Sequence, residues 1–339
     1  MDNYPLVSVI IPNYNHKSYL KQRIDSVLNQ SFQDFEVLIF DDASSDGSLE
    51  LLNTYKRHPK VSHFIVNSKN SGSPFVQWRK GIELAQGKYI WIAETDDFAE
   101  PTFLEETVSV MNNSESVALV YTDSKIVNKN GEHKGDWSTR KKSFFKTKRW
   151  SDNHNAKGKD EIIDYLLYKV TINNASAVLF RKKQLLKIDL DLLVRFKNVG
   201  DLYTYCSVLF ENRISYIAQA LNNYREHHLN LTKSNMNSGL FYIDALCCYN
   251  EIFNNLLDKR LSETQKKKLN KAFKFIIRRF GFNLVDCGYR KDLELFILTN
   301  YKNKVLSRID ALYYIIGFKL YSTKNAKLKD FIKHTLKKK

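Results

Sequence analysis

The chain has little of several features that define whole classes of protein. Its 339 residues include only 4 Cys, 5 Pro and 12 Gly, while 43% are hydrophobic. This composition excludes a collagen-like or low-complexity chain and permits a sizeable folded core. The cysteines show no CxxC spacing and no histidine pattern beside them. We therefore expect reduced thiols in a cytosolic setting, and neither a disulfide framework nor a zinc site.

Long hydrophobic runs are also missing. The first residues lead into a strand-like segment without the basic and apolar stretches of a signal peptide, so none is expected. The longest late apolar run, residues 311–318, is interrupted by Gly317. It is far shorter than the roughly 20 residues that span a bilayer. Any membrane contact is therefore expected to be peripheral.

Positive charge is in excess but unevenly distributed. The net charge is +16; residues 1–230 hold 30 basic and 28 acidic residues, whereas residues 231–339 hold 23 basic and 9 acidic ones. Such an excess permits nucleic acid, a membrane surface or an anionic substrate as partner. Because the basicity belongs to the last third, the sequence predicts a nearly neutral domain over 1–230 and a basic extension over 231–339.

Short apolar runs alternate with helical periodicity along the first domain, which is typical of βα units and a mostly parallel sheet. Strands are predicted at residues 6–11, 35–40, 61–66, 89–93, 117–121, 175–180 and 215–217. Residues 128–160 are rich in Lys, Asn, Ser and Gly and predict a long surface loop. From about residue 240 the pattern is helical. The fold class is therefore α/β with a C-terminal α-helical extension.

Two acidic clusters follow predicted strands. Asp41 and Asp42 come after the second strand, and Asp96 and Asp97 after the fourth. Ligands of open α/β sheets bind at the carboxyl ends of strands, so both clusters are expected at one edge. Aspartates there can bind a base or ribose and can ligate Mg²⁺ or Mn²⁺ on a diphosphate. A single pair alone is more often a turn or a cap.

Several ordered strings carry a family resemblance: Pro12-Asn13-Tyr14-Asn15, Gln30-Ser31-Phe32, the stretch from Asp41 to Ser48, Asn70-Ser71-Gly72, the stretch from Gly81 to Ile90, and Glu94-Thr95-Asp96-Asp97. Together they resemble family 2 inverting glycosyltransferases of the bacterial polysaccharide-biosynthesis type. The match is dense over about residues 5–125 and thinner to about 230. It implies a GT-A fold, which is Rossmann-like with a mostly parallel central sheet, and a nucleotide-diphosphate sugar donor.

The resemblance also implies roles for single residues. Tyr14 would pack on the base and Asp42 would bind a pyrimidine imide, which favours a UDP-sugar. Asp96 would contact ribose or metal, and Asp97 would ligate Mn²⁺ or Mg²⁺. Other residues expected to line the donor site are Pro12, Asn15, Asn70, Arg79 and Glu94. Glu94 departs from the aspartate common at its position, and the preceding Trp78 in the string Gln77 to Lys80 is expected to be core.

Inversion requires a general base that takes the proton of the acceptor hydroxyl. The matching position is Asp201, at the start of a predicted helix; a helix cap fits the same residue equally well. The string from Leu221 to His228 resembles the family's closing motif. Its Arg225 and His227 either reach the diphosphate or anchor a loop, and the sequence leaves these alternatives open.

The basic extension has two predicted parts. An apolar stripe over residues 269–284 is expected to be mainly structural, and the 312–339 tail is expected to face an anionic membrane. The acceptor would then be a glycan or a polyprenyl-diphosphate-linked sugar in capsule, O-antigen (lipopolysaccharide) or similar synthesis, on the inner face of the cell membrane. A basic nucleic-acid-binding protein with a degenerate nucleotide module is the alternative, although no nucleic-acid-binding signature accompanies the cations. A nucleotidyltransferase would show a Gly-rich, Lys-bearing loop near the first strand, and residues 13–15 have none.

Overall fold

A computed structural model describes residues 4–226, 236–257, 261–323 and 325–338. Contacts divide the chain into two compact units. One comprises residues 1–158, 171–197 and 211–228; the other comprises 159–170, 198–210 and 229–339. The single boundary expected at residue 230 thus differs from this division, because two earlier segments pack with the C-terminal helices.

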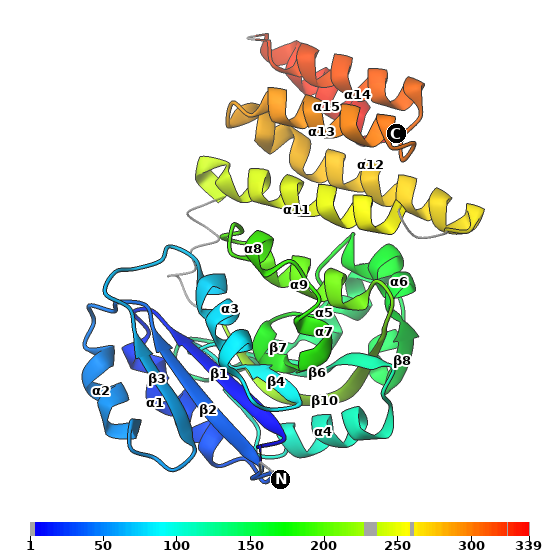
Figure 1. The fold of residues 1–339 in the computed structure, drawn as a ribbon. Helices are drawn as coiled ribbons and strands as arrows, with labels where there is room; N and C mark the ends of the chain where they lie inside the picture. The colour runs from blue at the N-terminus through cyan, green and yellow to red at the C-terminus, as the bar shows by residue number, and fades with distance from the viewer. Residues whose placement is uncertain (1–3, 227–235, 258–260, 324, 339) are drawn as a thin grey trace. The chain divides into compact units, whose positions relative to one another are not determined.

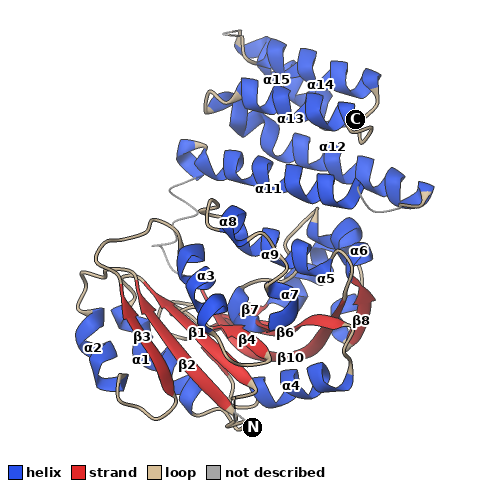
Figure 2. Cartoon of the chain, in the orientation of Figure 1, coloured by secondary structure: helices blue, strands red, loops and turns tan. Residues whose placement is uncertain are grey.

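The first unit is built on one mixed sheet, drawn in red in Figure 2. Its strands are β1 (Val7–Asn13), β2 (Phe35–Asp41), β3 (Val61–Val66), β4 (Tyr89–Ile92), β5 (Phe98–Ala99), β6 (Val117–Val127), β7 (His133–Asp136), β8 (His154–Lys157), β9 (Val178–Arg181) and β10 (Arg213–Arg225). The order is β3-β2-β1-β4-β9-β6-β10-β5, with β7 beside β6 and β8 beside β10. β1 to β4, β6 and β10 run in one direction and the shorter strands run against them. The predicted α/β class is confirmed.

Helices cover both faces of this sheet (Figure 1). They are α1 (Lys17–Leu28), α2 (Ser48–Tyr55), α3 (Pro74–Leu84), α4 (Phe103–Asn113), α5 (Trp137–Phe145), α7 (Lys182–Leu185) and α8 (Leu190–Leu193), with 3-10 turns at Arg149–Ser151 and Ala175–Ala177. Successive side chains of a strand point to opposite faces. Val9 and Ile11 accordingly join the core formed with α1, α2 and α4. Ile10 faces α3, where Gly81 permits close approach because a Cβ there would meet the Ile10 side chain at 2.7 Å. This double covering explains why the strands are apolar on both faces.

The prediction of a long surface loop over residues 128–160 is wrong, because this segment contains two strands and a helix. β7 pairs with β6, with Lys125 opposite Asp136, and β8 pairs with β10, with Ser215 opposite Asn155. The strand predicted at 215–217 is also longer than expected, since β10 continues past two register shifts to Arg225. These strands are polar because they lie at the outer part of the sheet, so they lack the apolar runs by which the inner strands were found.

A buried lysine of α5 forms an ion pair with an aspartate of the sheet. Lys141 is fully buried, and its Nζ lies 3.6 Å from an Asp123 carboxylate oxygen. The same nitrogen stands 5.0–5.6 Å from the ring centroids of Tyr121, Trp150 and Tyr216. We expect Lys141→Met to lower the free energy of unfolding by about 3 kcal/mol, because removal of one partner leaves a buried charge uncompensated.

Urea unfolding followed by tryptophan fluorescence measures this change. Lys142→Met is the matched control, because Lys142 is the next residue of α5 and its Nζ lies at a long distance of 3.5 Å from Ser151 Oγ. That substitution should change the free energy of unfolding by no more than about 0.5 kcal/mol. Equal changes in the free energy of unfolding at the two positions would contradict a stabilising role for the buried ion pair of Lys141.

The second unit is helical. It contains α6 (Gly158–Glu161, of which Gly158 itself belongs to the first unit), a π-helical turn (Ile162–Leu166), α9 (Gly200–Leu209), α11 (Leu240–Leu257), α12 (Glu263–Asp286), α13 (Arg290–Lys302), α14 (Arg308–Tyr321) and α15 (Ala326–Lys338). Ser262 and Gln265 form a capping box at the start of α12. The predicted stripe of α12 is buried as expected of a structural face, and comprises Leu269, Phe273, Ile276, Ile277, Phe280 and Leu284.

The tail divides into packed and exposed residues. Ile332 and Leu336 of α15 are buried, and Leu336 packs on Gly317 of α14. These two residues are therefore not available to face a membrane, because their side chains are buried. The opposite side of α14 exposes Ile309, Leu312, Ile316 and Leu320, which are 40–75% accessible. Within the described ranges, no helix is long and apolar enough to cross a membrane.

Candidate functional site

The two acidic clusters lie at the same edge of the sheet. β1 and β2 are in register, with Asn13 beside Asp41 at their ends. β1 also pairs with β4, which ends just before residues 94–97, called here the acidic loop. Asn13 Nδ2 donates to Asp41 Oδ1 at 2.7 Å, and Thr95 Oγ1 donates to the Pro12 carbonyl at 3.3 Å. Parallel β2, β1 and β4 thus bring both clusters to one carboxyl edge, as the strand-end pattern predicts.

Asp42 is buried and already hydrogen-bonded. Its carboxylate accepts from Asn67 Nδ2 at 2.6 Å, from Ser71 Oγ at 2.6 Å and from the Ser71 backbone at 3.0 Å. Asp41 is held separately, by Asn13 and by the Ser44 backbone. A base imide that reaches Asp42 would therefore share its oxygens with, or replace, the donors of Ser71.

The loop after β1 presents an exposed aromatic ring. Tyr14 is 41% accessible, and Asn15 follows in the left-handed region with φ of 55°. Asparagine is one of the few residues besides glycine that adopt this backbone conformation. The Asn15 Oδ1 accepts from the Ser45 backbone at 2.8 Å, which ties this loop to the loop after β2. Asn70 is exposed and its Oδ1 accepts from the Gly72 backbone. The exposed ring of Tyr14 suits stacking on a base.

Hydrogen bonds of different kinds anchor the acidic loop, and the Asp96 carbonyl accepts from Arg225 Nε at 2.8 Å. Asp97 is buried; its Oδ1 accepts from the Arg225 backbone at 2.9 Å and its Oδ2 from Asn174 Nδ2. Burial, with the neighbouring Asp96 carboxylate, raises the pKa of Asp97. Asp96 is half-buried. A cation near these like charges would stabilise their ionised forms.

Glu94 is engaged by two residues of other elements. Trp78 Nε1 of α3 donates to Glu94 Oε1 at 2.8 Å, and Arg23 Nε of α1 donates to the Glu94 carbonyl at 2.8 Å. Burial raises the pKa of Glu94 to about 8, and the Asp96 carboxylate adds to the shift. Burial lowers the pKa of Arg23 to about 10, against the opposing attraction of Asp97.

The carboxylates fit a divalent cation only as part of its shell. Among the described residues, no three His, Cys, Asp or Glu side chains converge as a ready-made site. Mg²⁺ usually takes one or two protein carboxylates and completes its shell with water and phosphate oxygens. Asp96 and Asp97 supply oxygens of this kind, so the residues present agree with a cation brought in with a diphosphate.

Two arginines that were predicted to line the donor site, Arg225 and Arg79, bind acceptors within the protein. Arg225 is buried, and its guanidinium donates to the carbonyls of Asp96, Asn128 and Lys129 and to Gln22. This arrangement is the loop-anchoring alternative, and its donors face protein acceptors rather than a diphosphate. Arg79 pairs with Glu83 and Asp191. His227 lies outside the described residues.

Asp201 lies in the first turn of α9, in the helical unit. The cap position of this helix is Val199, so Asp201 is not the N-cap that the sequence allowed as an alternative. Its Oδ1 accepts from the adjacent Leu202 backbone at 2.7 Å. Burial raises the pKa of Asp201 to about 6, and the carboxylate of Asp244 adds to this. A carboxylate with such a pKa suits proton transfer near neutral pH.

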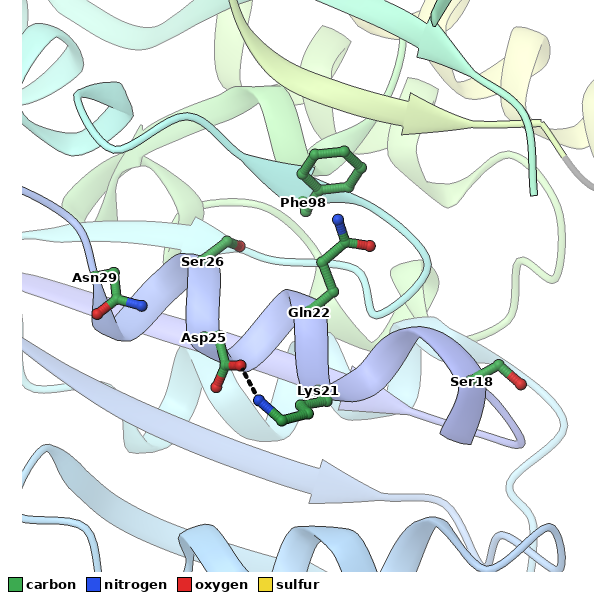
Figure 3. Close-up of a pocket in the computed structure, with 7 residues that line it drawn as sticks. All are labelled: Ser18, Lys21, Gln22, Asp25, Ser26, Asn29 and Phe98. Atoms are coloured by element: carbon green, nitrogen blue, oxygen red, sulfur yellow. Dashed lines mark hydrogen bonds and ion pairs between the residues drawn. The ribbon is translucent and has the colours of Figure 1, made fainter. Parts of the chain in front are cut away.

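A groove of about 570 Å³ lies along α1. Figure 3 shows its polar lining and the ion pair between Lys21 and Asp25. Its lining residues are Ser18, Lys21, Gln22, Asp25, Ser26, Asn29 and Phe98. None of these residues was predicted to belong to the site, but Phe98 directly follows Asp97, and Gln22 Oε1 accepts from Arg225 Nη2 at 2.7 Å.

Arg23 and Asn174 are the contacts of the acidic loop that sequence reasoning missed. Arg23 had a detectable signal, because it interrupts the apolar face that Leu20, Ile24 and Val27 form on α1, and a fully buried cation needs compensation. Asn174 lies just before the strand predicted at residues 175–180 and had no comparable signal. Its contact joins residues 77 positions apart, which no local pattern reveals.

Comparison with known proteins identifies the family of the chain. Residues 8–186, more than half of the chain, match the family model described as Glycosyl transferase family 2. The chain therefore belongs to glycosyl transferase family 2 and is a glycosyltransferase. It is 36% identical over 128 residues to the chondroitin synthase of Escherichia coli, covering 38% of this chain and 18% of that protein. It is 34% identical over 127 residues to TuaG of Bacillus subtilis, a putative teichuronic acid biosynthesis glycosyltransferase, covering 38% and 50%. The chain thus spans at most half the length of these two relatives.

Solved structures establish the GT-A fold. Residues 1–349 of S. aureus TarS in complex with UDP-GlcNAc superpose with a TM-score of 0.70 at 19% identity, covering 98% of this chain and 90% of that one. The mannosyltransferase PcManGT from Pyrobaculum calidifontis, in complex with GDP-Man and Mn²⁺, gives a TM-score of 0.54 at 14% identity, covering 98% and 85%. The TarS likeness includes the C-terminal helices, because it extends over nearly the whole chain.

Proposed function

We propose that this glycosyltransferase moves a sugar from a nucleotide-diphosphate sugar, with UDP-sugars favoured, to a glycan or polyprenyl-diphosphate-linked acceptor in cell-surface polysaccharide synthesis such as that of capsule or O-antigen. The observation that carries the proposal is the meeting of two acidic clusters at the carboxyl edge of β1, β2 and β4 in a family 2 chain. The nucleotide-sugar complexes of the similar structures support the donor class.

Residues of the first unit would hold the donor. Tyr14 presents an exposed ring for the base, and Asp42 presents carboxylate oxygens for an imide. Pro12, Asn15 and Asn70 would shape the adjoining loops, and Asp96 would contact ribose or a cation. Arg79 and Arg225 are not assigned to the phosphates, because their guanidinium groups bind protein acceptors.

Asp96 and Asp97 would hold Mn²⁺ or Mg²⁺ on the diphosphate. Such an ion neutralises the charge that develops on the departing nucleoside diphosphate. The chain's own contribution is to orient these two acids: the Arg225 backbone and Asn174 fix the Asp97 carboxylate, and the loop positions Asp96 beside it.

Asp201 is proposed as the general base. Its carboxylate takes the proton of the acceptor hydroxyl while that oxygen bonds to the anomeric carbon and the bond to the diphosphate breaks. Attack from the face opposite the leaving group inverts the anomeric configuration. The raised pKa of Asp201, about 6, leaves it ionised at neutral pH and basic enough to accept a proton.

A transfer assay tests this function. The protein is incubated with a UDP-sugar, Mn²⁺ and a glycan or polyprenyl-diphosphate-sugar acceptor, and nucleoside diphosphate release and product configuration are measured. We expect acceptor-dependent release and a glycosidic bond of inverted configuration. A product that retains the donor's configuration, or no transfer with any of the UDP-, GDP- or dTDP-sugars, would contradict the proposal.

The exposed face of α14 is proposed to lie on the anionic inner leaflet of the cell membrane. Ile309, Leu312, Ile316 and Leu320 form an apolar stripe, and the same helix carries Arg308 and Lys319. A basic helix with an exposed apolar face suits an interfacial position, where each nearby cation contributes on the order of 1 kcal/mol. This position would bring a lipid-linked acceptor to the enzyme.

We expect the double variant Leu312→Gln, Ile316→Gln to bind anionic vesicles at least about tenfold more weakly, since loss of two apolar side chains removes roughly 2 kcal/mol of partitioning. Sedimentation of the whole chain with phosphatidylserine-containing vesicles measures this. Leu186→Gln is the control, since Leu186 is 50% exposed in the other unit. Unchanged vesicle binding with an altered oligomeric state would mean that the stripe contacts protein instead.

The alternative of a nucleic-acid-binding protein with a degenerate module is answered by family membership, which identifies an enzyme. We therefore propose an anionic membrane, rather than nucleic acid, as the surface that the basic C-terminal helices contact.

A further inference from the structure

Glu94, the first acid of the loop after β4, is held by hydrogen bonds to its backbone N–H, its carbonyl and its carboxylate. Its backbone N–H donates to Ser176 Oγ at 3.1 Å, its carbonyl accepts from Arg23 Nε at 2.8 Å, and its carboxylate accepts from Trp78 Nε1 at 2.8 Å. Trp78 is 2% exposed and Arg23 is fully buried. The partners come from α3, α1 and the turn at 175–177, which are separate elements.

The bond to Trp78 depends on length rather than charge. An indole N–H is a donor with no charge and no acceptor capacity, so it requires only an oxygen at the right distance. Glutamate and glutamine both place an oxygen there. Aspartate is one methylene shorter, so it would leave a buried indole N–H without its acceptor, which is costly.

Glu94 lies in the same loop as the two acids assigned to the donor and its cation. Asp96 and Asp97 follow within three residues, and the Asp97 backbone N–H donates to the same Glu94 carbonyl at 3.3 Å. Arg23 therefore holds the oxygen on which the turn of the loop closes. Trp78 fixes the side chain of the same residue from α3, so the loop's conformation is set from two helices.

We infer that Glu94 is a positioning residue, which Trp78 and Arg23 hold so that Asp96 and Asp97 keep the conformation that binds the nucleotide diphosphate and its cation. The inference rests on the proposed function, because it concerns the acids assigned to the donor. It gives Glu94 no contact with sugar, ribose or cation.

The test compares Glu94→Gln with Glu94→Asp in the full chain. The dissociation constant of the nucleoside diphosphate (UDP, GDP or dTDP, whichever binds the unaltered protein) is measured with Mn²⁺ by calorimetry, beside each variant's melting temperature. We expect Glu94→Gln to bind within about threefold of the unaltered protein, and Glu94→Asp and Trp78→Phe to bind about tenfold more weakly, since a buried donor or acceptor loses its partner. In Trp78→Phe, a second change to Glu94→Asp should add little, because the shared bond is already gone.

Tyr89→Phe is the matched control, because it removes one buried side-chain bond, to Asn112 at 2.7 Å, from the other end of β4. It should leave the dissociation constant unchanged. The inference is overturned if Glu94→Asp binds normally while Glu94→Gln does not, since the charge would then contact the ligand. It is also overturned if Glu94→Asp lowers only the melting temperature. If no nucleotide binds the unaltered protein, the proposed function fails first, and the inference fails with it.

Discussion

Asp201→Asn is expected to lower kcat for sugar transfer by about 10²- to 10⁴-fold, the range typical of a lost general base. Asparagine keeps the size of the side chain and an acceptor oxygen for the Leu202 backbone, but it cannot take a proton. Donor binding depends on residues of the other unit and should change by less than about threefold. Transfer kinetics and donor calorimetry separate the two effects. Transfer at the unaltered rate would show that Asp201 is not the base.

The pH profile provides the control for this assignment. The unaltered enzyme should lose rate below about pH 6, where Asp201 becomes protonated. The carboxylate of Asp244 raises the pKa of Asp201, because a like charge disfavours ionisation. Asp244→Asn should therefore lower that pKa and move the acidic limb to lower pH without removing activity. A limb that stays in place would contradict the assignment of this limb to Asp201.

Asp97→Ala is expected to weaken Mn²⁺-dependent donor binding by at least about 100-fold, since a bound cation contributes several kcal/mol of charge stabilisation. The change removes a cation ligand and also leaves Asn174 and the Arg225 backbone without their acceptor. Calorimetry with and without Mn²⁺ measures the loss. The affinity without Mn²⁺ should fall much less.

Asp41→Ala is the control for the structural part of that loss. Asp41 is equally buried at the end of β2 and accepts from Asn13 and from the Ser44 backbone. Its loss should lower stability by a similar amount but leave the Mn²⁺ dependence of donor binding intact. If both variants lose that dependence equally, Asp97 acts through the fold and not as a ligand.

The positions of the inner strands along the chain followed from the sequence, because each carries a local apolar run beside an amphipathic helix. β7, with residues His133–Asp136, and β8 carry no such run, and their pairing with β6 and β10 joins distant segments. The sequence pattern therefore predicted a loop where the chain forms sheet. The same limit hid the full length of β10, which continues through polar residues to Arg225.

The site divides in the same way. The strand-end placement of Asp42 and Asp97 was predictable, because a turn of polar residues follows each apolar run. Their partners were not, since Ser71 and Asn174 lie 29 and 77 residues away. Glu94 is the clearest case: its identity as an unusual acid was visible, but its bond to Trp78 depends on how α3 packs.

The central claim is that the acidic edge of the sheet binds a nucleotide-diphosphate sugar with a divalent cation. A thermal-shift screen of UDP-, GDP- and dTDP-sugars, each with Mn²⁺, Mg²⁺ or a chelator, tests it most directly, because a ligand that binds the folded state raises its melting temperature. We predict that one nucleotide class, UDP-sugars first, stabilises the chain with metal and much less with chelator, and that Asp97→Ala abolishes this difference. No stabilisation by any of the three classes would contradict the claim.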